Sequence, residues 1–253
     1  MNDNSTDDEV HFSSYRRYFN SGFYQRRYPK PNTRTLKTIE GKVNRGDTIL
    51  DIGCGDGRYA LQLFESCKLL NALDISEEAV KDLRQSIIDR NLINIKVFVC
   101  KPPIRLKTFF PEVSLDGIII IFGVLSHIVD QQARSALLDE IHASLKSDGF
   151  LVLSVPNSSR RFRKEQKMQQ NSTIFYTRLH EGSHLEFNYK LFQLDELRQE
   201  IHRAGFSHVE IIPESIFPET FVVNSKILGW LDKLLCAIVP TRWAYGYLVT
   251  AIK

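Results

Sequence analysis

The most constraining feature of the chain is the segment DTILDIGCGDGRYALQL, residues 47–63. It opens with a short apolar run, Ile49–Ile52, of the kind that forms a strand buried on both faces. Glycines follow at the alternate positions 53, 55 and 57, and helix-forming residues come directly after them. A strand, a glycine turn and a helix in this order predict a loop whose backbone approaches a ligand closely, because glycine has no Cβ. The helix N-terminus adds free N–H groups and a partial positive charge.

A second short apolar run, Leu69–Ser76, carries an acid, Asp74, near its end. A carboxylate at the end of the strand that follows a glycine turn is placed to accept hydrogen bonds from the ribose hydroxyls of a nucleoside ligand. A glycine turn that only closed a structural hairpin would need no such acid. The two features together predict a nucleoside-cofactor site.

The spacing of the glycines in the turn distinguishes between cofactors. NAD-binding loops read G-x-G-x-x-G, whereas this loop reads G-x-G-x-G and has Asp51 two residues before the first glycine. This sequence pattern resembles the first motif of the class I methyltransferases, the seven-stranded, Rossmann-like family that depends on S-adenosylmethionine (SAM). The resemblance extends over roughly residues 40–210 and includes the later helix–glycine–strand segment LLDEIHASLKSDGFLVLSVPN.

The resemblance implies an α/β fold with a doubly wound, mostly parallel seven-stranded sheet, its last strand antiparallel and helices on both faces. We expect residues 1–12 to form a disordered tail and residues 13–43 an N-terminal lid or helical segment. Residues 44–253 then form the Rossmann-like domain, with insertions at about 156–190 and 214–243.

The resemblance also implies SAM as the cofactor and S-adenosylhomocysteine as its product. In the family, the residue that matches Asp51 lies near the amino group of the methionine moiety, and the residue that matches Asp74 binds the ribose. The expected cofactor-binding residues are Asp51, Gly53, Cys54, Gly55, Asp56, Gly57, Asp74, Ile75, Phe122 and Gly123. Many relatives follow the third strand with an aspartate that binds adenine, but this chain has Lys101-Pro102-Pro103 there. The adenine contact therefore departs from the family pattern.

Composition excludes several other classes of protein. The 33 basic and 30 acidic side chains leave a net charge of +3, which is too small to imply nucleic acid by itself. The four cysteines form no C-x-x-C pair, so neither a zinc ribbon nor a disulfide framework is indicated. The first residues are polar and acidic, unlike a signal peptide, and the purest apolar run, Gly117–Leu125, is too short to span a bilayer. We expect a cytoplasmic, reduced protein with no transmembrane segment.

The segment before the first strand is rich in aromatic residues and arginines. In the family such a segment often closes over the cofactor and the acceptor, which strips water from the site and positions the acceptor. We predict Tyr24, Arg27 and Tyr28 as the contacts of this lid. The alternative is a helix packed on the sheet edge with its arginines in solvent.

The fourth strand, Asp116–Phe122, is nearly all apolar and therefore central in the sheet. Ligands of open α/β sheets lie outside the carboxyl ends of such strands. His127 follows this end closely, and its ordinary pKa suits a base that removes a proton from the acceptor. A histidine that only hydrogen-bonds at the start of the next helix is the alternative.

The first insertion contains a basic cluster that includes Arg160 and Arg161, followed by several aromatic residues. Such a patch suits an anionic acceptor or RNA, although a charge run is often just a solvated helix face. The insertion also contains His180-Glu181-Gly182-Ser183-His184, which matches H-E-x-x-H. Because Gly182 and Ser183 disfavour a helix interior, we expect no metal and assign His180 and His184 to substrate contacts.

The second insertion contains an apolar stretch with helical spacing from Ile227 to Val239. Packing against the domain is the interpretation we favour. Alternatives are a cap over the acceptor pocket, a homodimer contact, or a contact with a membrane surface.

Together these features predict methyl transfer to an O, N or C nucleophile of a small-molecule, saccharide or lipid-linked acceptor that carries negative charge. One alternative is a tRNA methyltransferase of the wobble-uridine type, which the lid and the basic insertion resemble. Another is a non-catalytic subunit that binds cofactor or a partner protein. Salt-sensitive retention of tRNA would support the former, and cofactor binding without turnover the latter.

Overall fold

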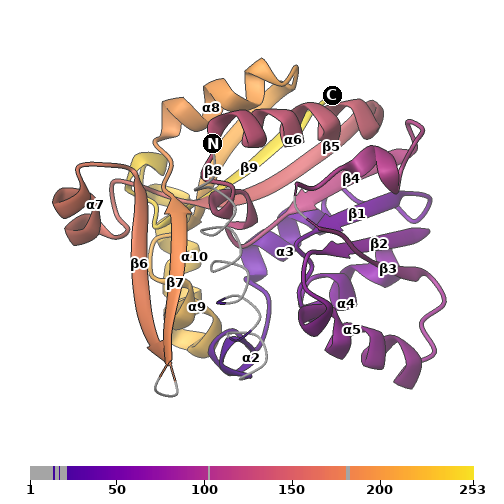
Figure 1. The fold of residues 1–253 in the computed structure, drawn as a ribbon, viewed down its shortest axis with the longest axis horizontal. Helices are drawn as coiled ribbons and strands as arrows, with labels where there is room; N and C mark the ends of the chain where they lie inside the picture. Colours follow the sequence, from indigo (N-terminus) through magenta and orange to yellow (C-terminus); the bar gives the residue numbers. More distant parts are fainter. Residues whose placement is uncertain (1–13, 15–16, 18–21, 102, 181–182) are drawn as a thin grey trace, which may run out of the picture.

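The computed structural model describes residues 14, 17, 22–101, 103–180 and 183–253, so the predicted disordered tail lies outside the described residues. A seven-stranded sheet with the order β3-β2-β1-β4-β5-β9-β8 forms its centre (Figure 1). Neighbouring strands from β3 to β5 run parallel, whereas β9 is antiparallel to both β5 and β8. This is the sheet that the sequence predicted.

The strands form where the chain is apolar enough to be buried by helices on both faces of the sheet. Their bounds are Thr48–Ile52 (β1), Leu69–Asp74 (β2), Ile95–Val99 (β3), Leu115–Ile120 (β4), Leu145–Pro156 (β5), Ser207–Ser215 (β8) and Gly246–Ile252 (β9). One core cluster packs under α6 (Gln131–Ser144) and α8 (Leu194–Arg203). A second packs under α3 (Thr33–Glu40), α4 (Ala60–Leu63) and α5 (Glu77–Asp89). Figure 1 shows these two groups on opposite faces of the sheet.

Two helix starts follow directly from capping chemistry. The Ser76 hydroxyl accepts a hydrogen bond from the Ala79 N–H at 3.2 Å, and α5 begins one residue after this cap. The Asp130 carboxylate likewise accepts from the Ala133 N–H at 2.7 Å at the start of α6. By contrast, the helix expected directly after the glycine turn is short and late. The chain stays in turns through Tyr59, and α4 begins only at Ala60.

The first insertion forms a helix and a hairpin that project from the sheet. Helix α7 spans Arg163–Gln169, and the hairpin pairs β6 (Thr173–His180) with β7 (Ser183–Lys190). Of the H-E-x-x-H run, His180 ends β6, and Ser183 and His184 begin β7. Both histidines are therefore on strands.

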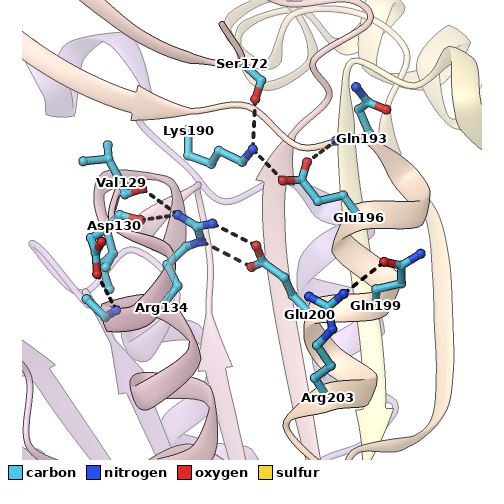
Figure 2. A network of polar contacts seen from close by, with 12 residues as sticks. Val129, Asp130, Arg134, Ser172, Lys190, Gln193, Glu196, Gln199, Glu200 and Arg203 are labelled. Atoms are coloured by element: carbon cyan, nitrogen blue, oxygen red, sulfur yellow. Dashed lines mark hydrogen bonds and ion pairs between the residues drawn. The ribbon is translucent and has the colours of Figure 1, made fainter.

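Buried polar contacts tie the hairpin base, α6 and α8 together (Figure 2). The Arg134 guanidinium donates to both carboxylate oxygens of Glu200, at 2.8 and 3.2 Å. It also donates to the carbonyls of Ile128 and Val129, at 3.0 and 2.9 Å. Arg134 is 2% exposed and Glu200 9% exposed. Arg134 binds the two carbonyls just before α6, so the Arg134–Glu200 pair also holds the loop between His127 and α6 in place.

At the end of β7, Lys190 forms a second ion pair with a glutamate of α8. Its ammonium donates to the Glu196 carboxylate at 2.6 Å and to the Ser172 hydroxyl at 2.9 Å. The hairpin is thereby attached to the first turn of α8 (Figure 2).

The second insertion forms α9 (Glu219–Asn224) and α10 (Lys226–Ile238), followed by the short turn η4 (Thr241–Trp243). The N-terminal segment contains α2 (Phe23–Arg27). The Asn224 side chain donates to the Arg27 carbonyl at 3.0 Å. The lid segment and the second insertion therefore meet, although 197 residues separate these two positions.

Candidate active site

The glycine turn and Asp74 form one hydrogen-bonded unit. All three glycines adopt positive φ angles, +76° at Gly53, +55° at Gly55 and +83° at Gly57. The Gly55 N–H donates to Asp74 Oδ2 at 2.8 Å, and the N–H groups of Ile75 and Ser76 donate to Oδ1 at 2.8 and 3.0 Å. An ionised carboxylate has about four acceptor sites, so this one is held rigidly and keeps room for about one further donor, such as a ribose hydroxyl.

Asp51 lies on β1 beside this unit and is only 3% exposed. None of the residues that the structure describes donates a hydrogen bond to its carboxylate. Burial, and secondarily the Asp74 carboxylate, raise its pKa from 3.8 to about 7, against the opposing effect of Arg58. A buried acid in this state is a site where a ligand cation would be stabilised.

The carboxyl end of β4 is bent by two consecutive residues with positive φ, Phe122 at +68° and Gly123 at +76°. Ser154 on β5 holds this bend. Its hydroxyl accepts from the Phe122 N–H at 2.8 Å, and its carbonyl accepts from the Gly123 N–H at 3.0 Å. A Cβ on Gly123 would lie 2.3 Å from the Tyr189 hydroxyl, so glycine is needed for the hairpin to approach the strand end.

The lid segment meets the glycine turn through aromatic rings. The rings of Tyr24 and Tyr28 lie 5.7 and 4.5 Å from the Phe122 ring in edge-on geometry. The Arg58 guanidinium lies 4.3 Å from the Phe122 centroid and 5.6 Å from those of both tyrosines. Cation–π contacts of this kind are strongest when water is excluded, and Arg58 is 9% exposed. The described part of the predicted lid segment therefore packs against the end of β4 and against Arg58, the residue that follows the glycine turn.

A cavity of about 490 Å³ lies beside this lid, at the carboxyl ends of β4, β5 and β8. The hairpin, the lid and the start of α9 form its remaining walls. Its basic lining residues are Arg27, Arg160, Arg161, Arg163 and Lys164, and its aromatic ones are Tyr24, Tyr28, Phe122, Phe162, Tyr176, Phe187, Tyr189 and Tyr245. The Arg161 guanidinium lies 5.0 Å from the Tyr245 centroid.

Two buried carboxyl groups lie on the opposite side of the cavity. Glu214 accepts a hydrogen bond from the Thr35 hydroxyl at 3.0 Å, and burial together with the nearby Glu219 raises its pKa from 4.5 to about 8. Burial also raises the pKa of Glu219, although Arg58 opposes this shift. Glu219 Oε1 lies 3.9 Å from Arg58 Nη1. Burial thus favours the uncharged form of Glu214, and the basic lining residues give the cavity positive charge.

Several buried nitrogens of these arginines have no hydrogen-bond partner in the described part of the chain. They are Nε, Nη1 and Nη2 of Arg58 and Nε of Arg161. Buried donors are almost always satisfied in native proteins. Of these two arginines, Arg161 lines the cavity and Arg58 does not.

Most of the site residues predicted from the sequence lie around the glycine turn or the cavity. Tyr24, Arg27, Tyr28, His127, Arg160 and Arg161 line the cavity, as do Phe122 and Gly123. The thiol of Cys54 points back to the Gly55 carbonyl at 3.8 Å, and burial raises the pKa of Asp56. His184 is exposed on β7, away from the lining residues. The His180 side chain and Pro102 lie outside what the structure describes, so their predicted roles stay predictions.

The sequence reasoning missed Arg58, Tyr189, Glu214 and Glu219 as site residues. Arg58 directly follows the last glycine of the turn, and that position was the one available signal. The other three belong to the hairpin and the second insertion, which approach the site only through the tertiary fold.

The geometry fits SAM. The carboxylate of Asp51, which has no hydrogen-bond donor among the described residues, suits the ammonium of the methionine moiety, and Asp74 keeps an acceptor site for the ribose. The fold and these residues define a Rossmann-like, SAM-dependent methyltransferase.

Comparison with known proteins agrees with this class. A sequence profile of the methyltransferase domain family matches residues 24–211, most of the chain, and the protein belongs to this family. An uncharacterized protein of Methanocaldococcus jannaschii is 27% identical over 203 residues, which cover 74% of this chain and 71% of the relative.

Two solved structures share the fold. A SAM-dependent methyltransferase from Methanosarcina mazei superimposes with a TM-score of 0.62 at 18% identity, and the match covers 85% of this chain and 96% of that one. The DhpI–SAM–HEP complex superimposes with a TM-score of 0.65 at 15% identity and covers 97% and 96% of the two chains. These identities are too low to carry an acceptor over to this protein.

Proposed function

We propose that the protein methylates a small, anionic acceptor, free or linked to a lipid or saccharide, that enters the cavity beside Phe122. The observation that carries this proposal is the cluster of basic side chains that line the cavity, among them Arg161, whose buried Nε has no hydrogen-bonded partner among the described residues. A carboxylate or phosphate on the acceptor would satisfy these donors. Hydrogen bonds between ions of opposite charge are roughly twice as strong as neutral ones.

The cofactor site would be formed by Asp51, the glycine turn and Asp74. When bound, SAM supplies a methyl group that is already activated by the positive charge on sulfur. The protein then has to align the acceptor and exclude water, which is how the closed lid and the aromatic walls contribute. Tyr24 and Tyr28 pack against Phe122 at the end of β4, and the Tyr189 hydroxyl lies against Gly123 and limits the cavity there.

Two residues of the cavity are suited to hold the proton that the acceptor loses. His127 is one, and its ring lies 4.7 Å from the Tyr189 ring. Glu214 is the other at a pH above about 8, where its carboxylate is ionised and free to take a proton. We propose that His127 has this role when Glu214 is protonated and that Glu214 contributes above pH 8.

The test is transfer of a labelled methyl group from SAM to separated fractions of a cell extract, namely anionic small molecules, lipids and bulk tRNA. We expect label in an anionic small-molecule or lipid fraction, and a KM for that fraction at least tenfold higher in Arg161→Gln. Arg203→Gln changes an exposed arginine on α8 and serves as the matched control. Label confined to tRNA, with equal KM values for both variants, would contradict the proposal and favour the RNA alternative.

A further inference from the structure

The outer face of the second insertion is apolar and exposed to solvent. Along α10 the side chains of Ile227, Trp230, Leu231, Leu234 and Ile238 recur at helical spacing and form one stripe, here called the outer stripe. Ile227 and Ile238 are each 77% exposed and Trp230 is 63% exposed. Phe221 on α9 and Trp243 in η4 are two more exposed apolar side chains of the second insertion, at 55% and 53% exposure.

The orientation of α10 is fixed by its inward side. Asp232 is 3% exposed, and its Oδ1 accepts hydrogen bonds from the N–H groups of Ile216 and Phe217, both at 2.8 Å. Cys236, one turn later, is buried beside it and lies 3.6 Å from Asp232 Oδ2. Leu235, Cys236 and Val239 also pack against the domain core, so the expectation that this apolar stretch packs on the domain is confirmed for its inward side. It is wrong for the outer stripe, which faces away from the domain.

The exposed charged residues of the segment 221–243 are all basic. Between residues 221 and 243 the exposed charged side chains are Lys226, Lys233 and Arg242, and the single acid, Asp232, is buried. An anionic lipid surface complements an apolar face with a basic rim. A symmetric contact with a second copy would place the same lysines near one another, so this charge pattern favours lipid over self-association.

Both tryptophans of the chain lie on this surface. Tryptophan concentrates at the boundary between bilayer and water, where its ring is buried and its N–H stays near polar groups. In the described residues no helix is long and apolar enough to cross a bilayer, so the geometry suits a contact from one side.

The segments on either side of α9 and α10 adjoin the acceptor cavity. Thr220, next to Phe221, lines the cavity. Arg160 lines it as well, and its guanidinium donates to the Trp243 carbonyl at 2.7 Å. A lipid contact through this surface would place the cavity rim at the membrane boundary.

We infer that the outer stripe, with Trp243 and the three basic residues, binds the protein to the surface of an anionic membrane. This inference goes beyond the proposed methyl transfer and does not depend on it, because lipid contact requires neither cofactor nor acceptor.

The experiment is co-sedimentation with vesicles of phosphatidylcholine alone and of phosphatidylcholine mixed with phosphatidylglycerol. We expect the full chain to bind the mixed vesicles at least tenfold more tightly than the neutral ones. The combined variant Ile227→Ser/Trp230→Ser/Leu234→Ser/Ile238→Ser is expected to lose binding at least tenfold. The matched control, Ile88→Ser/Ile93→Ser, removes side chains that are 71% and 90% exposed elsewhere and should bind as the wild type.

Tryptophan fluorescence gives a second measurement that needs no disruptive variant. Since both tryptophans lie on this surface, emission should shift to shorter wavelength when mixed vesicles are added, and Lys226→Glu/Lys233→Glu should weaken that response at least threefold. Unaltered emission and no sedimentation of the wild type would overturn the inference. So would a wild-type dimer that the combined variant converts to monomer without any vesicle binding, which would assign the outer stripe to a second copy. Neither of these results would contradict the proposed methyl transfer to a free small molecule.

Discussion

Replacing Asp51 with asparagine should make the protein more stable while removing its ability to bind SAM. The Asp51 carboxyl is buried without a hydrogen-bond donor from the described residues, and burial with the neighbouring Asp74 raises its pKa from 3.8 to about 7. Each unit of pKa difference between folded and unfolded states corresponds to about 1.36 kcal/mol. The ionised carboxylate therefore destabilises the free protein by up to about 4 kcal/mol above pH 7.

The sign of this effect is set by which state holds the proton. Between pH 3.8 and about 7 the unfolded chain has lost the Asp51 proton and the folded chain has kept it, so stability falls as pH rises through this window. Asparagine carries no titrating proton in either state. The two proteins should be equally stable near pH 4, and Asp51→Asn should be the more stable one at pH 8.

The assay is thermal and denaturant unfolding at a series of pH values, with and without SAM. Wild type should gain stability from SAM and gain more at pH 8 than at pH 6, because the cationic cofactor binds the ionised carboxylate. Asp51→Asn should gain almost nothing. Asp89→Asn, at an exposed position on α5, is the control and should follow wild type. Parallel pH profiles for wild type and Asp51→Asn would refute the reasoning, as would an undiminished SAM response in the variant.

Three further substitutions test other parts of the structure. Arg134→Met should lower the free energy of unfolding, measured in denaturant, by about 3–5 kcal/mol, because Glu200 is left buried without its partner. The double variant Arg134→Met/Glu200→Leu should recover stability. Equal losses in the single and double variants would contradict this explanation. Glu214→Gln should match wild type in melting temperature near pH 4 and exceed it at pH 9, because burial raises the pKa of this acid from 4.5 to about 8; a constant difference across pH would argue against a buried, titrating carboxyl. Gly123→Ala should lower the melting temperature and methyl transfer together, since a Cβ there meets a tyrosine hydroxyl at 2.3 Å, whereas Gly46→Ala, with nothing within 4 Å, should change neither.

The parts of the site that the sequence predicted are those encoded locally. The strand, the glycine turn and Asp74 lie within a short segment, and the positive φ angles of the glycines follow from the turn itself. The Ser76 and Asp130 helix caps are local in the same sense, because each side chain accepts a hydrogen bond from an N–H three residues later.

The parts that were missed depend on contacts between distant segments. Arg58 reads from sequence as a solvated residue near a helix start, but its neighbours Tyr24, Phe122 and Glu219 come from three other parts of the fold. The orientation of α10 was likewise not readable. Its apolar spacing predicts one buried stripe, but the hydrogen bonds of Asp232 and the core packing of Cys236 show that another side is turned inward.

The most direct test of the cofactor site is calorimetric titration of SAM and S-adenosylhomocysteine into wild type and Asp74→Ala. Asp74 joins the glycine turn to the end of β2 and keeps an acceptor site for the ribose. We predict micromolar binding by wild type and a loss of about 1–3 kcal/mol in the variant, equivalent to a roughly five- to 150-fold weaker affinity. Equal affinities for the two proteins, with Asp74→Ala fully folded, would contradict the assignment of this site.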